Sequence, residues 1–166
     1  MSIRQEIWNR VTEGRIRQLS KHVPTDPSLR SVYLTRKLHD QVFMDRWDIK
    51  DIERFAYLEA DLEHFVISKT LKSTYLYGLS PVLEGIWEIR SRRPRPSIRV
   101  FCMFAAKDTL VCTHLALRKD LGEDFQAEIR MAKAIWRQLF NPYNPLCSNN
   151  VNELFTGALH DQYFKS

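Results

Sequence analysis

Hydrophobic side chains recur every three or four residues in three stretches of the first half of the chain, which is the period of an amphipathic helix. These stretches predict helices over residues 3–20, 28–46 and 48–72, and Asp48 is a favourable N-cap for the third. Two prolines lie between the first two stretches and break the helical pattern there. We expect all three helices to turn their apolar faces to a core.

After a loop predicted over residues 73–85, the pattern changes to short segments rich in β-branched and aromatic side chains. Each segment is flanked by turn residues, and the connections between the segments are short. The pattern therefore predicts an antiparallel sheet whose strands follow one another along the chain. The strands are expected at Ile86–Ser91, Ser97–Ala105 and Thr109–Leu117.

The helical period returns over residues 125–139, and a shorter helix is predicted over about 151–164. The predicted fold class is α+β, built on a small antiparallel β-sheet with C-terminal helices. Residues 1–72 form an N-terminal helical extension, 73–140 the sheet with its helix, and 141–166 a linker and terminal helix. We expect the three parts to form one compact unit.

Composition excludes several classes of protein. The 166 residues are 44% hydrophobic, with nine Phe, six Tyr and four Trp, so the chain is not disordered. No run of about 18 apolar residues predicts a membrane span. The first residues are charged and lack the apolar segment of a signal peptide, so we expect a cytoplasmic protein.

The cysteines indicate reduced thiols. Cys102, Cys112 and Cys147 are odd in number and irregularly spaced, which does not match a disulfide framework. Cys112 lies two residues before His114, but a structural zinc site needs about four such ligands and no second pair is present. No metal and no cofactor are expected.

Positive charge is concentrated in one part of the chain. The formal net charge is +5, and residues 83–140 carry eleven Lys and Arg against seven Asp and Glu. The rest of the chain carries fourteen against thirteen. A local basic surplus attracts polyanions, and RNA is the first partner to consider. The alternative is a solvated basic face without a partner.

Side chains alternate between the faces of a strand, so the apolar faces of the first two predicted strands can coincide in the sheet. On that reading Arg90 and Arg99 lie together on the opposite, exposed face. The third strand leads through His114 to Arg118 and Lys119. Such a surface can grip phosphates. The rim of the same surface is the loop that carries Arg92, Arg93 and Arg95.

The order of these residues resembles the RelE/ParE superfamily, and most closely its phage-derived HigB-like toxins. The resemblance covers about residues 76–140, under half of the chain. The matching pieces are Leu83–Arg90, Ile98–Phe101, His114 through Arg118-Lys119, Glu128-Ile129 and Ala132. The sequence departs from the family pattern at Cys102, at Ala116 and in the acidic run that follows Lys119.

The resemblance implies a metal-independent endoribonuclease that cleaves mRNA on the ribosome, by attack of a 2′-hydroxyl on the adjacent phosphate. That reaction needs a base, an acid and positive charge on the phosphorane. If the residue roles of the family are carried over to this chain, Arg90 and Arg99 would bind and stabilise the phosphate. Lys119 would stabilise charge or move a proton, and His114 is the candidate base. RNA would further be bound by Arg92, Arg93, Arg95 and Arg118. An antitoxin protein and a second copy of the chain are the other partners implied.

Several alternatives remain open at the level of sequence. The presence of Arg90 and Arg99 would also be explained by surface ion pairs with Glu88 and other acids. The presence of His114 would also be explained by a structural role in its strand. Charge and proline in the loop at 92–96 also protect an edge strand from pairing. The competing functions are a non-catalytic RNA- or DNA-binding module on the same fold, a protein-interaction domain, and a ParE-like protein directed at DNA gyrase.

Overall fold

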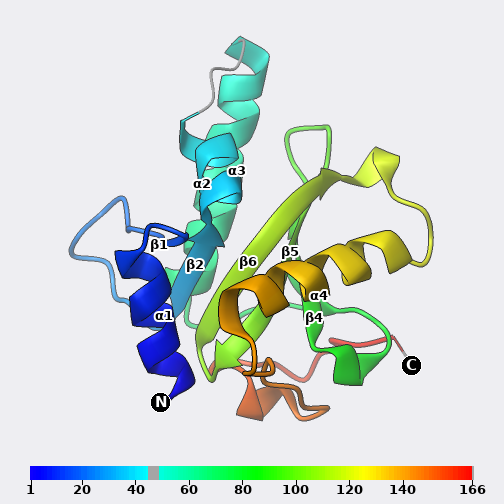
Figure 1. Cartoon of the computed structure of the whole chain (residues 1–166). Helices are drawn as coiled ribbons and strands as arrows, with labels where there is room; N and C mark the ends of the chain where they lie inside the picture. The colour runs from blue at the N-terminus through cyan, green and yellow to red at the C-terminus, as the bar shows by residue number, and fades with distance from the viewer. Residues whose placement is uncertain (45–48, 166) are drawn as a thin grey trace.

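The computed structural model describes residues 1–44 and 49–165 (Figure 1). The predicted N-cap Asp48 lies outside these residues. Within them a single sheet runs through the molecule, with helices packed on both of its faces. The predicted α+β class is confirmed, although the sheet is larger than expected.

The sheet has six strands in the order β1-β2-β6-β5-β4-β3. All neighbouring strands are antiparallel except β2 and β6, which are parallel, so the sheet is mixed and not antiparallel throughout. The three strands expected from the sequence are present as β4, β5 and β6. The strands are β1 (Ile16–Gln18), β2 (Ser31–Thr35), β3 (Leu76–Gly78), β4 (Ile86–Ser91), β5 (Ile98–Ala106) and β6 (Thr109–Leu117).

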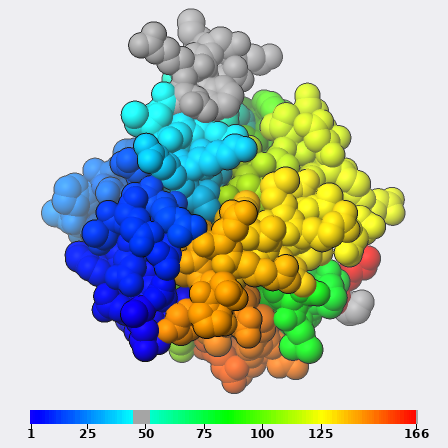
Figure 2. Space-filling model, in the orientation of Figure 1, coloured from blue at the N-terminus to red at the C-terminus, as the bar shows by residue number. Residues whose placement is uncertain are grey.

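Four helices cover the two faces of the sheet. The described helices are α1 (Ile3–Thr12), α2 (Arg36–Phe43), α3 (Ile49–Ile67) and α4 (Gln126–Phe140). One core lies between the sheet and α2 and α3, with Leu58, Leu62 and Phe65 fully buried in it. A second core lies between the sheet and α1 and α4, and contains Trp136 and Phe140. In Figure 2 the side chains of α1 (blue) and α4 (yellow to orange) cover much of the near side of the sheet.

The first 72 residues are not wholly helical, and two of the predicted helices are wrong in part. The helix predicted over 3–20 ends at Thr12, and the chain turns at Gly14 with a φ of 75° before it enters β1. The helix predicted over 28–46 begins as strand β2, in which alternate residues face the two cores. Pairing with β6, which is far away along the chain, stabilises β2 as a strand.

The terminal helix predicted over 151–164 is also wrong. Only Val151–Glu153 form a single 3₁₀ turn, and the following chain lies extended against the body of the protein. Gly78 and Leu71 form isolated bridges to Phe164 and Ala158. The loop predicted at 73–85 accordingly contains the edge strand β3, which this segment partly covers.

A buried arginine holds the C-terminal segment in place. The guanidinium of Arg30 donates hydrogen bonds to the carbonyls of Phe65, Ser68, Lys69 and Thr156 at 2.6–3.3 Å. Carbonyls of two separate parts of the chain, residues 65–69 and Thr156, thus satisfy one desolvated cation. Among the described residues, no helix is long and apolar enough to cross a membrane.

Candidate nucleic-acid interface

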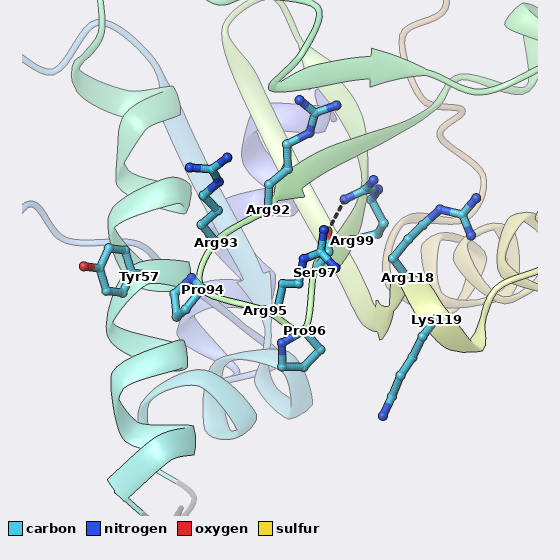
Figure 3. A pocket seen from close by; sticks show the side chains of 10 residues that line it. All are labelled: Tyr57, Arg92, Arg93, Pro94, Arg95, Pro96, Ser97, Arg99, Arg118 and Lys119. Carbon is cyan, nitrogen blue, oxygen red and sulfur yellow. Dashed lines mark hydrogen bonds between the residues drawn. The ribbon is translucent and has the colours of Figure 1, made fainter.

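The loop between β4 and β5 forms one wall of a groove with a volume of about 1230 Å³, which we call the basic groove (Figure 3). Six of its lining side chains are cationic, and none of the described residues that line it is acidic. Five of the six predicted nucleic-acid contacts here are solvent-exposed, and only Arg99 is buried. The lining residues are Tyr57, Arg92, Arg93, Pro94, Arg95, Pro96, Ser97, Arg99, Arg118 and Lys119.

Arg90 and Arg99 lie on the same face of the sheet, as predicted, because they are directly paired across β4 and β5. The buried carboxylate of Glu88 lies close to both. The Nε of Arg90 donates a hydrogen bond to Glu88 Oε1 at 2.7 Å, and the Nε of Arg99 is 3.6 Å from Glu88 Oε2. The ion pairs with Glu88 that the sequence left open are therefore present.

Arg99 was expected to be exposed, and that prediction is wrong: its exposed fraction is 9%. It lies on a central strand, and its Nη1 donates a hydrogen bond to Ser97 Oγ at 2.8 Å. Burial lowers the pKa of Arg99, and the nearby Glu88 carboxylate opposes that shift. Arg99 nevertheless lines the basic groove, where a positive charge with little water around it interacts strongly with a phosphate.

Arg90 does not line the basic groove. Its guanidinium lies over the ring of Tyr77, 4.5 Å from the ring centroid, and lines a neighbouring hollow of about 490 Å³. Arg99 and Arg118 line both this hollow and the basic groove. The hollow also contains acidic side chains, among them Glu123 and Asp124. The two spaces therefore differ in charge although they share two arginines.

His114 is not among the residues that line either space. Its ring stacks on Phe101 with 4.9 Å between the centroids, and its Nε2 is 2.8 Å from Oε2 of Glu128 on α4. Its Nδ1 is 2.9 Å from Thr113 Oγ1. Burial lowers the pKa of His114, and the hydrogen bond and charge of Glu128 partly offset this. The structure thus brings six of the predicted site residues together and leaves Arg90 and His114 outside the groove.

Arg54 on α3 positions the loop of the basic groove and is not among the site residues predicted from the sequence. Its Nε donates to the carbonyl of Pro96 and its Nη2 to the carbonyl of Ser91, both at 2.7 Å. Ser91 Oγ in turn donates to Asp61 Oδ2 at 2.5 Å. Burial raises the pKa of Asp61, while Ser91 and Arg54 oppose this shift.

A signal for Arg54 is present in the sequence. It lies four residues before Leu58 and therefore on the buried stripe of the helix, where an unpaired charge would be costly. Such a residue needs a partner in the folded protein. The sequence does not tell which loop supplies that partner.

Comparisons with protein-family models, with curated proteins and with solved structures find no match to this chain. The geometry of the basic groove is therefore the basis on which a function is proposed.

Proposed function

We propose that this protein binds RNA through the basic groove. The observation that supports this is the gathering of six cationic side chains around one groove whose described lining contains no carboxylate. Cations in that arrangement repel one another unless a polyanion neutralises them. A nucleic-acid backbone supplies regularly spaced negative charges and releases counterions when it binds.

The arginines suit phosphate recognition in particular. A guanidinium presents a planar fork of N–H groups that binds two phosphate oxygens at once. Arg92, Arg93 and Arg95 are exposed on the loop, and Arg118 and Lys119 are exposed at the end of β6. Because Arg54 binds both ends of the loop, less conformational freedom is lost when RNA binds.

A second candidate function is metal-independent cleavage of the bound RNA, in the cytoplasm and on the ribosome, by a toxin with a RelE-like scaffold and an antitoxin partner. The observation that favours it is that Arg99 and Arg118 line both the basic groove and the hollow that contains Glu88 and Arg90. A phosphate between the two spaces would have arginines near it and a carboxylate close by. Lys119 would then stabilise charge on the leaving oxygen or donate a proton to it.

Salt-dependent binding tests the first function. The affinity for a single-stranded RNA oligomer is measured over a series of salt concentrations for the natural protein and for Arg93→Ala. We expect Arg93→Ala to weaken binding and to reduce the slope of log affinity against log salt by about 0.7, the value for one lost phosphate contact on a single strand. Arg130→Ala, which removes an exposed charge on α4, is the matched control and leaves both quantities unchanged.

If Arg93→Ala and Arg130→Ala weaken binding equally, the groove is not the binding site.

Cleavage is tested separately, with translated mRNA in the presence of a metal chelator and with Lys119→Ala as the comparison. Cleavage that is lost in Lys119→Ala supports the second function. Salt-dependent binding without cleavage leaves the binding function and removes the catalytic one.

A further inference from the structure

Tyr57 is the single aromatic side chain among the described residues that line the basic groove. It lies on the outer face of α3, and its exposed fraction is 51%. Among the described residues, none stacks on its ring or hydrogen-bonds to its hydroxyl. A half-exposed ring with no partner is available to a ligand.

The surroundings of Tyr57 distinguish it from other exposed aromatic side chains. Pro94 and Pro96 line the same groove and add apolar surface to it, while the remaining wall is cationic. Figure 3 shows Tyr57 on α3 at one end of this set, with its ring directed outward from the helix, and Arg118 and Lys119 at the other end. An apolar surface thus lies beside a surface that can hold phosphates.

We propose that Tyr57 stacks on a base of the bound nucleic acid and makes the basic groove selective for single-stranded RNA. This inference rests on the proposed RNA-binding function and specifies the substrate class of the same groove. Stacking on an aromatic ring is tolerant of sequence, because every base has a π-face. The groove therefore prefers unpaired RNA without requiring one base sequence.

A duplex does not satisfy both surfaces. Its base faces are covered by stacking within the helix, so a duplex offers phosphates to the arginines but nothing to Tyr57. A flexible single strand lets one base turn toward Tyr57 while neighbouring phosphates contact Arg93 and Arg95. An acidic peptide or an inorganic polyanion would likewise use the cations alone.

The experiment compares three ligands of equal length at one salt concentration: a single-stranded oligoadenylate, an abasic oligomer with the same backbone charge, and an RNA duplex. The natural protein is expected to bind the oligoadenylate about tenfold more tightly than the abasic oligomer, which is within the range for one stacked base. In Tyr57→Ala this preference disappears, while binding to the abasic oligomer and to the duplex is unchanged. Tyr57→Phe keeps the preference, because the ring is retained.

Trp8→Ala is the matched control, since Trp8 is also an exposed aromatic residue but lies on α1 and does not line the groove. It leaves all three affinities unchanged. Equal binding of the oligoadenylate and the abasic oligomer by the natural protein would overturn the inference, as would an unchanged preference in Tyr57→Ala. If Arg93→Ala still lowers the salt slope in that case, the proposed function stands and only the stacking fails. If none of the three ligands binds, the proposed function itself fails.

Discussion

Arg90 and Arg99 lie directly opposite each other on β4 and β5, and the carboxylate of Glu88 is close to both guanidinium groups. Two like charges in such a cross-strand pair repel one another. Glu88 is almost fully buried, and its two oxygens point to different arginines. The negative charge of Glu88 therefore offsets the repulsion between two neighbouring cations, of which Arg90 lines the hollow and Arg99 lines both the hollow and the basic groove.

Replacing Glu88 by Gln is expected to destabilise the protein by about 1–3 kcal/mol, because two neighbouring arginines lose the carboxylate between them. Chemical denaturation measures the change in the free energy of unfolding. Arg99→Ala should also destabilise the natural protein, yet have a smaller effect in the Glu88→Gln background. Purely additive effects of the two substitutions would contradict this coupling.

Arg54→Met is expected to lower RNA affinity, although Arg54 itself does not contact the RNA. The substitution keeps much of the side-chain volume but removes the hydrogen bonds to Ser91 and Pro96, so the loop of the basic groove becomes more mobile. We expect a several-fold weaker affinity with an unchanged salt slope, since no phosphate contact is lost. A slope that falls as it does in Arg93→Ala would show instead that Arg54 contacts the backbone.

The protonation of His114 is expected to oppose folding in mildly acidic solution. Burial lowers its pKa below the ordinary 6.5, Lys37 adds to this shift, and Glu128 opposes it. The unfolded chain then binds more protons than the folded one below about pH 6.5, so stability is full above that pH and falls as the pH drops toward the pKa in the folded state.

Titration of the His114 ring by NMR measures this pKa directly. In Glu128→Gln the pKa should fall further, because the charge that favours the imidazolium is removed. A pKa that rises in Glu128→Gln would contradict the assignment.

Trp136→Ala is expected to lower the free energy of unfolding by about 3–5 kcal/mol, the usual cost of removing a large buried aromatic side chain. Trp136 is 3% exposed in the core beneath α4, and its Nε1 donates to the carbonyl of Tyr143 at 2.8 Å. Thermal or urea unfolding checks this value. A loss below about 0.5 kcal/mol would be typical of a surface position and would show that α4 is not docked on the sheet.

The parts of the fold that the sequence predicted correctly depend on local contacts. Strands β4, β5 and β6 follow one another and pair with their neighbours along the chain, so alternation and turn residues are sufficient to find them. The same alternation placed Arg90 and Arg99 on one face. The exposure of Arg99 was predicted wrongly, because alternation gives the face of a side chain and not what covers it.

The wrong helix predictions concern segments that pair with parts of the chain far away in sequence. The helix prediction is wrong at strand β2 because its apolar residues also fit a helical spacing, and its partner β6 begins more than 70 residues later. The extended C-terminal segment was taken for helix for the same reason, and its bridges connect it to Leu71 and Gly78. Long-range pairing of this kind overrides local propensity.

By itself, the sequence determined the α+β class, the central antiparallel strands and the concentration of positive charge in residues 83–140, because periodicity, turn chemistry and charge are properties of neighbouring residues. Only the tertiary structure decided which cations share a groove, since that depends on α3 packing beside the loop between β4 and β5. This packing brought Tyr57 to the groove and Arg54 against its loop, while the packing of α4 placed Glu128 against His114. The contacts join residues far apart in the chain, so they form only when α3 and α4 are packed on the sheet.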